Sequence, residues 1–129
     1  MTWFIDTSAL VKLCVEELES VALDIFVDGN DLVASELVLT ELVRVVRLRS
    51  GSTHSARALL ETLDLVPADQ QLLASAGVLQ PDGLRSLDAI HLATALTLGD
   101  ACEGIITYDT RMQEAARAAG LTVPAPGQD

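Results

Sequence analysis

Four acidic residues have the type and the position to build one metal site: Asp6, Glu41, Asp88 and Asp109. Asp6 ends the short apolar run 3–5, and Asp109 follows the apolar run 104–107. Ligands of open parallel sheets bind beyond the carboxyl ends of the strands, where the loops converge. We therefore expect Asp6 and Asp109 to lie near one another if their strands are neighbours.

Glu41 and Asp88 lie in predicted helices. On a helical wheel Leu37, Val38 and Val45 share the side of Glu41, so this carboxylate points toward apolar surroundings, where it is costly without a partner or a metal. Asp88 lies in the first turn of its helix, where the helix dipole stabilises a negative charge. Taken singly, each acid also fits a turn, a helix end or an ion pair with an arginine. Their joint placement favours one site.

The chemistry that needs several converging carboxylates is phosphodiester hydrolysis assisted by one or two divalent ions. Carboxylate oxygens without a cysteine or histidine cluster favour Mg²⁺ or Mn²⁺ and do not fit structural zinc. We therefore expect the four acids to be both the metal ligands and the catalytic residues of a hydrolase.

Short apolar runs alternate with helical segments along the chain. We predict strands over 3–5, 32–34, 65–66, 104–107 and 121–123, and helices over 9–15, 17–27, 35–50, 55–62, 69–79, 86–99 and 110–119. This order predicts an α/β fold, a three-layer α/β/α sandwich with a central, mainly parallel sheet. The 129 residues fit a single domain over 1–123, followed by a Pro- and Gly-containing tail, 124–129, that we expect to be loosely held.

The net charge of −11 argues at first against a polyanionic substrate, unless bound cations meet the phosphates. The first residues lack a basic segment followed by a long apolar one, and no apolar run approaches the roughly 20 residues of a membrane span. We therefore expect a cytoplasmic protein with no membrane partner.

Four segments resemble the PIN-domain ribonucleases, and most of all the VapC-type toxins of bacterial toxin–antitoxin pairs. They are FIDTSAL at 4–10, TEL at 40–42, LDAIHLATA at 87–95 and ITYD at 106–109. The resemblance covers nearly the whole chain in the expected order. It implies a PIN-like fold, endonucleolytic cleavage of RNA, and a cognate antitoxin protein that blocks the site.

In that family the acids that match the four named above form the metal site, and the hydroxyls that match Ser8 and Thr107 orient its water and carboxylates. Many relatives carry a further acid or asparagine a few residues after the last aspartate. This chain has Thr-Arg-Met-Gln at 110–113 instead, which leaves one or two ions open.

The best candidates for contacts to RNA phosphates are Arg44 and Arg47 on the long helix and Arg85 before the Asp88 helix, although a solvated helix face explains them equally well. His91 follows Asp88 by three residues and is expected to be a packed, hydrogen-bonded residue.

Two other classes of protein gather acids in this way, and a third possibility is a PIN-like scaffold that only binds RNA or a partner. A receiver-type phospho-acceptor needs a lysine near the last strands, but the chain has only Lys12, in the first helix. A phosphatase with a nucleophilic aspartate needs a second aspartate two residues after Asp6, where this chain has Ser8. The apolar helices offer more hydrophobic surface than one small core needs, so we also expect a homodimer.

Overall fold

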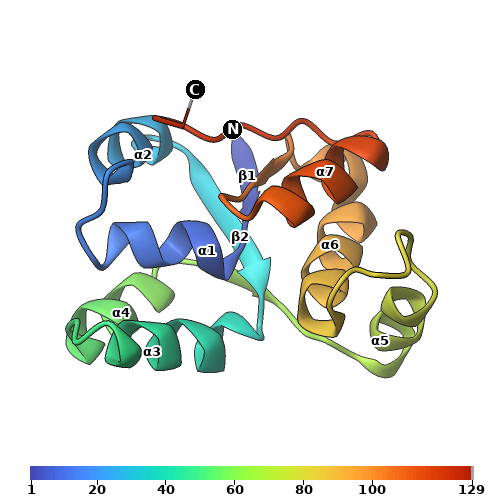
Figure 1. Cartoon of the computed structure of the whole chain (residues 1–129), viewed down its shortest axis with the longest axis horizontal. Helices are drawn as coiled ribbons and strands as arrows, with labels where there is room; N and C mark the ends of the chain where they lie inside the picture. Colours follow the sequence, from blue (N-terminus) through green and yellow to red (C-terminus); the bar gives the residue numbers. More distant parts are fainter. Residues whose placement is uncertain (129) are drawn as a thin grey trace.

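The computed structural model describes residues 1–128, which fold around a four-stranded parallel sheet of order β3-β2-β1-β4 (Figure 1). Because β1 lies between β2 and β4, its carboxyl end is flanked by a strand on each side. The strands are β1 (Thr2–Ile5), β2 (Asp31–Ser35), β3 (Asp64–Val66) and β4 (Ile105–Ile106).

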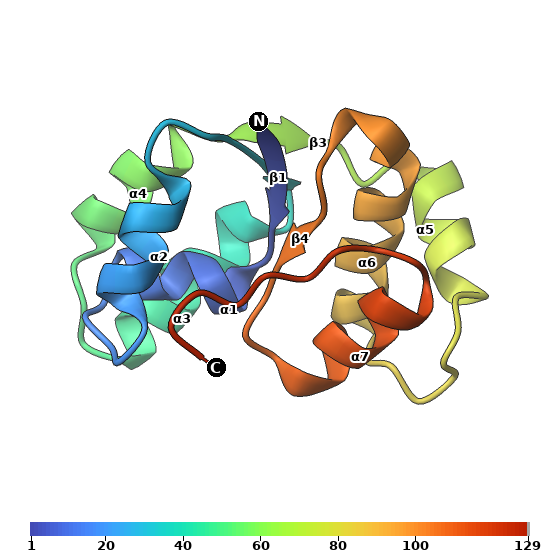
Figure 2. The same cartoon turned by 90° about the horizontal axis from the view of Figure 1, so that it is seen from above.

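Helices cover both faces of the sheet and make the three-layer α/β/α sandwich that the sequence predicts. One side carries α1 (Thr7–Leu10), the 3₁₀ turn η1 (Val11–Leu13), α2 (Ser20–Val27), α3 (Val38–Leu48) and α4 (Thr53–Leu60). The other side carries α5 (Gln70–Gly77), α6 (Ser86–Leu98), η2 (Gly99–Ala101) and α7 (Thr110–Ala118). Figure 2 shows the two helical groups on either side of the strands. Within residues 1–128, no helix has both the length and the apolar character needed to cross a membrane.

Strand alternation explains the two layers of core, because successive side chains of a strand point to opposite faces of the sheet. In each of β1, β2 and β4, one of two successive side chains packs among α1–α4, and the other packs against α6 and α7. The first set is Ile5, Ala34 and Ile106, and the second is Phe4, Val33 and Ile105. Because both faces of the sheet are buried, these strands appear in the sequence as short, continuous apolar runs.

The serines at the starts of the predicted helices 35–50 and 86–99 are the N-caps that the sequence favours, and both of these predictions are wrong. The hydroxyl of Ser35 accepts from the Leu37 backbone N–H at 3.2 Å, but α3 begins only at Val38, with Leu37 in the N-cap position. Ser35 is fully buried at the end of β2, so its side chain closes the strand-to-helix turn instead of capping the helix. In the same way Ser86 is the first residue of α6, and Arg85 occupies its N-cap position.

The predicted strand 121–123 is also wrong, although the segment lies beside β4. The Ile105 N–H donates to the Thr122 carbonyl at 3.0 Å, which is too little pairing to make a strand. A Cβ atom added to Gly104 would lie 2.1 Å from that carbonyl, so glycine allows this close approach.

The tail makes more contacts than a loosely held segment would. The Tyr108 hydroxyl donates to the Pro126 carbonyl at 2.7 Å, and the Gln113 amide donates to Gln128 Oε1 at 2.7 Å. Asp129, the last residue of the predicted tail, lies outside the described residues.

Candidate functional site

The carboxyl end of β1 and its neighbour β4 place two of the predicted acids. β1 and β4 pair directly, with Ile5 opposite Ile106. Asp6 follows β1 and is the N-cap of α1, while Asp109 is the N-cap of α7, where its Oδ1 accepts from the Met112 N–H at 2.9 Å. The condition under which these two acids are expected to lie near one another, that their strands are neighbours, is met.

Asp6 is the most enclosed acid of the site, with 3% of its surface exposed. Its Oδ1 accepts from the Ser8 hydroxyl at 2.7 Å and from the Ala9 N–H at 3.2 Å, and its Oδ2 accepts from the Thr107 hydroxyl at 2.5 Å. Burial raises the pKa of Asp6 above its ordinary value, and the bonds from Ser8 and Thr107 offset only part of that rise. The protein therefore fixes the orientation of this carboxylate before any ligand binds.

Glu41 projects from α3 and is held by two other elements. Its Oε1 accepts from the Thr7 hydroxyl at 2.9 Å, and His91 Nε2 of α6 lies 2.6 Å from the same oxygen. Burial alone would raise the pKa of Glu41, but the hydrogen bond and charge of His91, together with the Thr7 bond, lower it below its ordinary value. Glu41 is therefore suited to remain ionised.

His91 is a partner of Glu41 that no local sequence pattern indicates. It is 2% exposed, and its ring and the Phe4 ring pack in a T-shaped arrangement at a centroid distance of 6.4 Å. The structure confirms a packed, hydrogen-bonded histidine, but the sequence pattern offered arginine as the partner of Glu41. Within residues 1–128, His91 Nδ1 is a buried atom without a hydrogen-bond partner.

Asp88 lies in the first turn of α6 and is half-buried. Burial raises the pKa of Asp88, and the negative charges of Asp109 and Glu41 raise it further, while His91 and Arg85 lower it in part. Its side chain takes part in no hydrogen bond among the described residues. The negative charges of the other acids thus act on Asp88, and no hydrogen-bond donor among the described residues offsets them.

A cleft of about 680 Å³ opens beside these acids. Glu41 and Asp109 line it, together with Ser8 and Tyr108, whereas Asp6 is buried and Asp88 is not one of its lining residues. The cleft therefore gives a ligand access to part of the acidic site.

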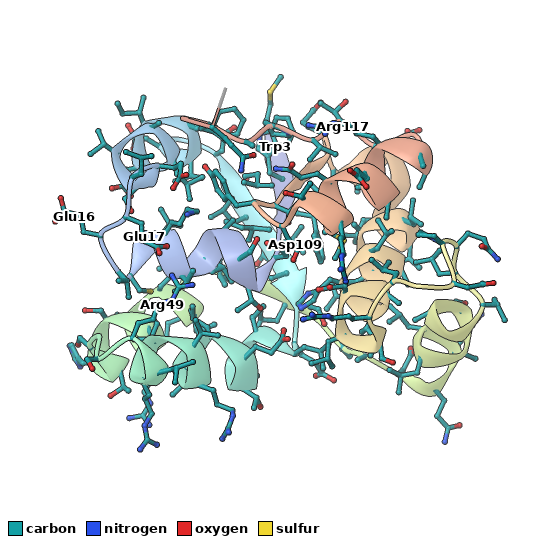
Figure 3. All side chains as sticks on the ribbon, viewed as in Figure 1. Trp3, Glu16, Glu17, Arg49, Asp109 and Arg117 are labelled. Atoms are coloured by element: carbon teal, nitrogen blue, oxygen red, sulfur yellow. The ribbon has the colours of Figure 1, made fainter. Side chains whose placement is uncertain are left out.

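The basic side chains that line this cleft differ in whether they are already paired with an acid. Lys12 is paired with Glu19 at 2.7 Å and with Glu17 at 3.5 Å, and Arg49 is also paired with Glu17 (Figure 3). Arg44 also lines the cleft and forms no ion pair within the described part of the chain. Arg44 is therefore the cation best placed to contact a ligand there.

The two other arginines predicted to contact RNA, Arg47 and Arg85, are exposed and do not line the cleft. The charge of Arg85 still offsets a small part of the rise in the pKa of Asp88. The helical wheel did not separate Arg44 from Arg47, because the position of the cleft depends on α1 and α6 as well as on α3.

A sequence model of the PIN domain matches residues 3–118. The chain belongs to the PIN-domain family. Ribonuclease VapC46 of Mycobacterium tuberculosis is 43% identical to this PIN domain over 125 residues, which cover 95% of this chain and 96% of the relative. Ribonuclease VapC35 of the same species is 43% identical over 131 residues, with 97% of each chain covered.

Solved structures share the fold of this PIN domain. VapC20 of Mycobacterium tuberculosis, described as a toxin that cleaves the sarcin–ricin loop, superposes with a TM-score of 0.77 at 18% identity and covers 98% of this chain and 100% of its own. A toxin–antitoxin complex from Klebsiella pneumoniae gives a TM-score of 0.69 at 22% identity, covering 96% of this chain and 97% of its own. At these identities the likeness establishes the fold.

The side chains of this PIN domain offer oxygen donors suited to Mg²⁺ or Mn²⁺, which prefer carboxylates and water. As they stand, no three Asp, Glu, His or Cys side chains within residues 1–128 are grouped closely enough to hold one ion. Mg²⁺ commonly uses one or two carboxylates and keeps several waters. The donor chemistry therefore fits a hydrated ion even without a tight cluster.

Proposed function

We propose that this PIN domain is a metal-dependent endoribonuclease that acts as the toxin of a toxin–antitoxin pair. The observation that carries the proposal is the placement of the acids: Asp6 and Asp109 follow the neighbouring strands β1 and β4, and Glu41 lines the same cleft as Asp109. The negative charges of Asp109 and Glu41 also raise the pKa of Asp88. Mutually repelling acids at a cleft are relieved by a divalent cation. The names of the relatives, ribonucleases of the VapC type, support RNA as the substrate.

Asp6, Glu41, Asp88 and Asp109 are the residues that would hold Mg²⁺ or Mn²⁺. A bound ion of this kind lowers the pKa of its water and neutralises charge on the phosphate. Ser8 and Thr107 would keep the Asp6 carboxylate in one orientation, because they donate to its two different oxygens. His91 and Thr7 would do the same for Glu41 through its Oε1.

The test is cleavage of a labelled RNA with Mg²⁺ or Mn²⁺, with EDTA, and with Asp88→Asn. We expect cleavage that depends on the metal and is lost with EDTA and in the variant. Asp100→Asn is the matched control, since Asp100 is an exposed acid of η2 outside the cleft. Activity that survives EDTA would contradict the proposal, and binding of RNA without cleavage would favour the scaffold alternative.

We also propose that Arg44 contacts the phosphates of bound RNA, with Arg47 and Arg85 contributing less from outside the cleft. Arg44→Gln should raise KM more than Arg47→Gln or Arg85→Gln, because only Arg44 of these three lines the cleft. Equal changes in KM for the three variants would instead indicate a diffuse electrostatic contribution.

We further propose that the protein is a homodimer. Large apolar side chains are exposed on α2 and α3, including Ile25 at 72% and Leu48 at 85%. Multi-angle light scattering at micromolar concentration should give the mass of two chains. Ile25→Glu and Leu48→Glu would report which helix lies in the interface, and a monomeric wild type would contradict the dimer.

A cognate antitoxin is the second partner that we propose, as in the Klebsiella pneumoniae complex. An antitoxin Arg or Lys placed at the acids would replace the cation electrostatically. Added Mn²⁺ should therefore weaken binding of a co-expressed antitoxin to the wild type. Affinity that is independent of both Mn²⁺ and Asp88 would show that the antitoxin binds elsewhere.

A further inference from the structure

The last described residues, 124–128, continue from the segment beside β4 to α2 and are called the C-terminal strap here. Both views show the chain after α7 running past the strands toward the other helical group, and the strap is the last part of this path (Figures 1 and 2). At the α2 end Gly127 has φ +83°, and a Cβ atom on it would lie 3.0 Å from the Ala22 Cβ atom. The strap is therefore packed closely against the helix at its far end.

On its way the strap is bonded to the segment that follows β4. The Tyr108 hydroxyl donates to the Pro126 carbonyl at 2.7 Å. The second bond comes from α7, where Gln113 Nε2 donates to Gln128 Oε1 at 2.7 Å.

The residues that follow β4, loop 107–109, also hold the Asp6 carboxylate. Gln113 Nε2 also donates to the Thr107 carbonyl at 2.9 Å, and Gln113 is buried. The Tyr108 N–H donates to the Ser8 hydroxyl at 2.9 Å, and the Thr107 hydroxyl donates to Asp6. A continuous series of hydrogen bonds therefore leads from the strap through loop 107–109 to a buried carboxylate of the site.

We infer that the C-terminal strap is a positioning element of the acidic site. By holding Tyr108 and Gln113 it fixes loop 107–109, and with it the Thr107 hydroxyl on Asp6 and the Asp109 carboxylate at the cleft. The inference rests on the proposed function, since it assigns the strap a part in metal binding. A strap that only stabilised the fold would leave the metal affinity of the folded protein unchanged.

The experiment compares the full chain with a variant lacking 124–129 and with the double variant Tyr108→Phe/Gln128→Ala, which keeps the strap but removes both of its bonds to the loop and α7. Arg117→Gln is the matched control, because Arg117 donates at 3.4 Å to the Val123 carbonyl, just before the strap, and within residues 1–128 its side chain has no hydrogen bond to loop 107–109. Circular dichroism establishes that each protein is folded at the temperature of measurement.

Two quantities are measured: the Mn²⁺ dissociation constant, by the electron paramagnetic resonance signal of free Mn²⁺, and hydrogen exchange of the Tyr108 amide in EDTA. Loss of partners that orient a metal ligand typically weakens metal binding by about 10–100-fold. We expect about tenfold weaker Mn²⁺ binding and faster Tyr108 exchange in both strap variants, and neither change in Arg117→Gln. Saturating Mn²⁺ should restore the cleavage rate of the strap variants.

Folded strap variants with wild-type Mn²⁺ affinity would overturn the inference, and the double variant decides the matter if the truncated chain does not fold. A wild type that binds no Mn²⁺ would instead refute the proposed metal site. In that case exchange at Tyr108 decides whether the strap holds the loop at all, and an unchanged rate would overturn that part as well.

Discussion

Asp6 and Asp88 are two carboxylates of one candidate site that the protein treats in different ways. Burial raises the pKa of both, but Asp6 has hydrogen-bond donors on each oxygen, which offset part of its rise. Asp88 has acidic neighbours, and their charges raise its pKa further. The difference suggests a division of roles: the fold supplies the partners of Asp6, while the charge of Asp88 is left to be met by a cation.

The largest expected effect concerns the carboxylate that the fold holds. Asp6→Asn keeps the size of the side chain but removes the charge, so we expect RNA cleavage to fall more than the roughly 100-fold upper range seen for outer partners of a metal ligand. Single-turnover cleavage at saturating RNA measures this. Cleavage within tenfold of the wild type would show that Asp6 is a structural cap of α1 and not a ligand.

The next effect concerns a donor to Asp6. Thr107→Val removes the hydroxyl at nearly constant shape and leaves Asp6 Oδ2 without its donor, which costs about 1–3 kcal/mol of unfolding free energy. We also expect Mn²⁺ affinity to fall by about 10–100-fold. Denaturant unfolding in EDTA and Mn²⁺ titration measure the two effects. Thr107→Ser restores the hydroxyl and should recover most of both; if it does not, the loss comes from packing.

Asp88→Asn should have effects of opposite sign with and without metal. In EDTA the variant should be more stable than the wild type by about 0.2–1 kcal/mol, the usual range for partly exposed charges. Mn²⁺ at ten times its dissociation constant should stabilise the wild type by about 1.4 kcal/mol, or roughly 4–7 °C in Tm, and the variant far less. Melting curves of both proteins decide it, and a less stable variant that keeps the full Mn²⁺ shift would show that the acids do not form one site.

The smallest expected effect is a change in how steeply the unfolding free energy varies with pH. A raised carboxyl pKa in the folded state favours folding while the group is protonated, and this contribution is lost as pH rises through the raised value. The lowered pKa of Glu41 acts in the opposite sense, and its contribution is lost only as pH falls below the ordinary value of 4.5. Above that value the unfolding free energy in EDTA should therefore fall with pH, and fall less steeply in Asp88→Asn. Urea unfolding at several pH values compares these slopes, with Asp100→Asn expected to match the wild type.

Local patterns in the sequence predicted the layers of the fold and the acids near the ends of β1 and β4, because strand runs and helix ends are encoded by neighbouring residues. The pairing of Glu41 with His91 joins residues 50 positions apart, and no local pattern specifies it. A histidine on the same helical face as Asp88 was the available signal. The contacts of the strap and the place of Arg47 and Arg85 outside the cleft also depend on how distant segments pack.

The segment 121–123, which pairs with β4 through one bond from Ile105 to Thr122, has a consequence for association between chains. β4 is the last strand in the order of the sheet, and an open strand edge presents backbone groups to which a strand of another molecule can add. By occupying the backbone N–H of Ile105, the segment blocks part of that edge with the protein's own chain. Its irregular path, and the glycine at 104 that lets it approach, thus act against unwanted polymerisation through the sheet.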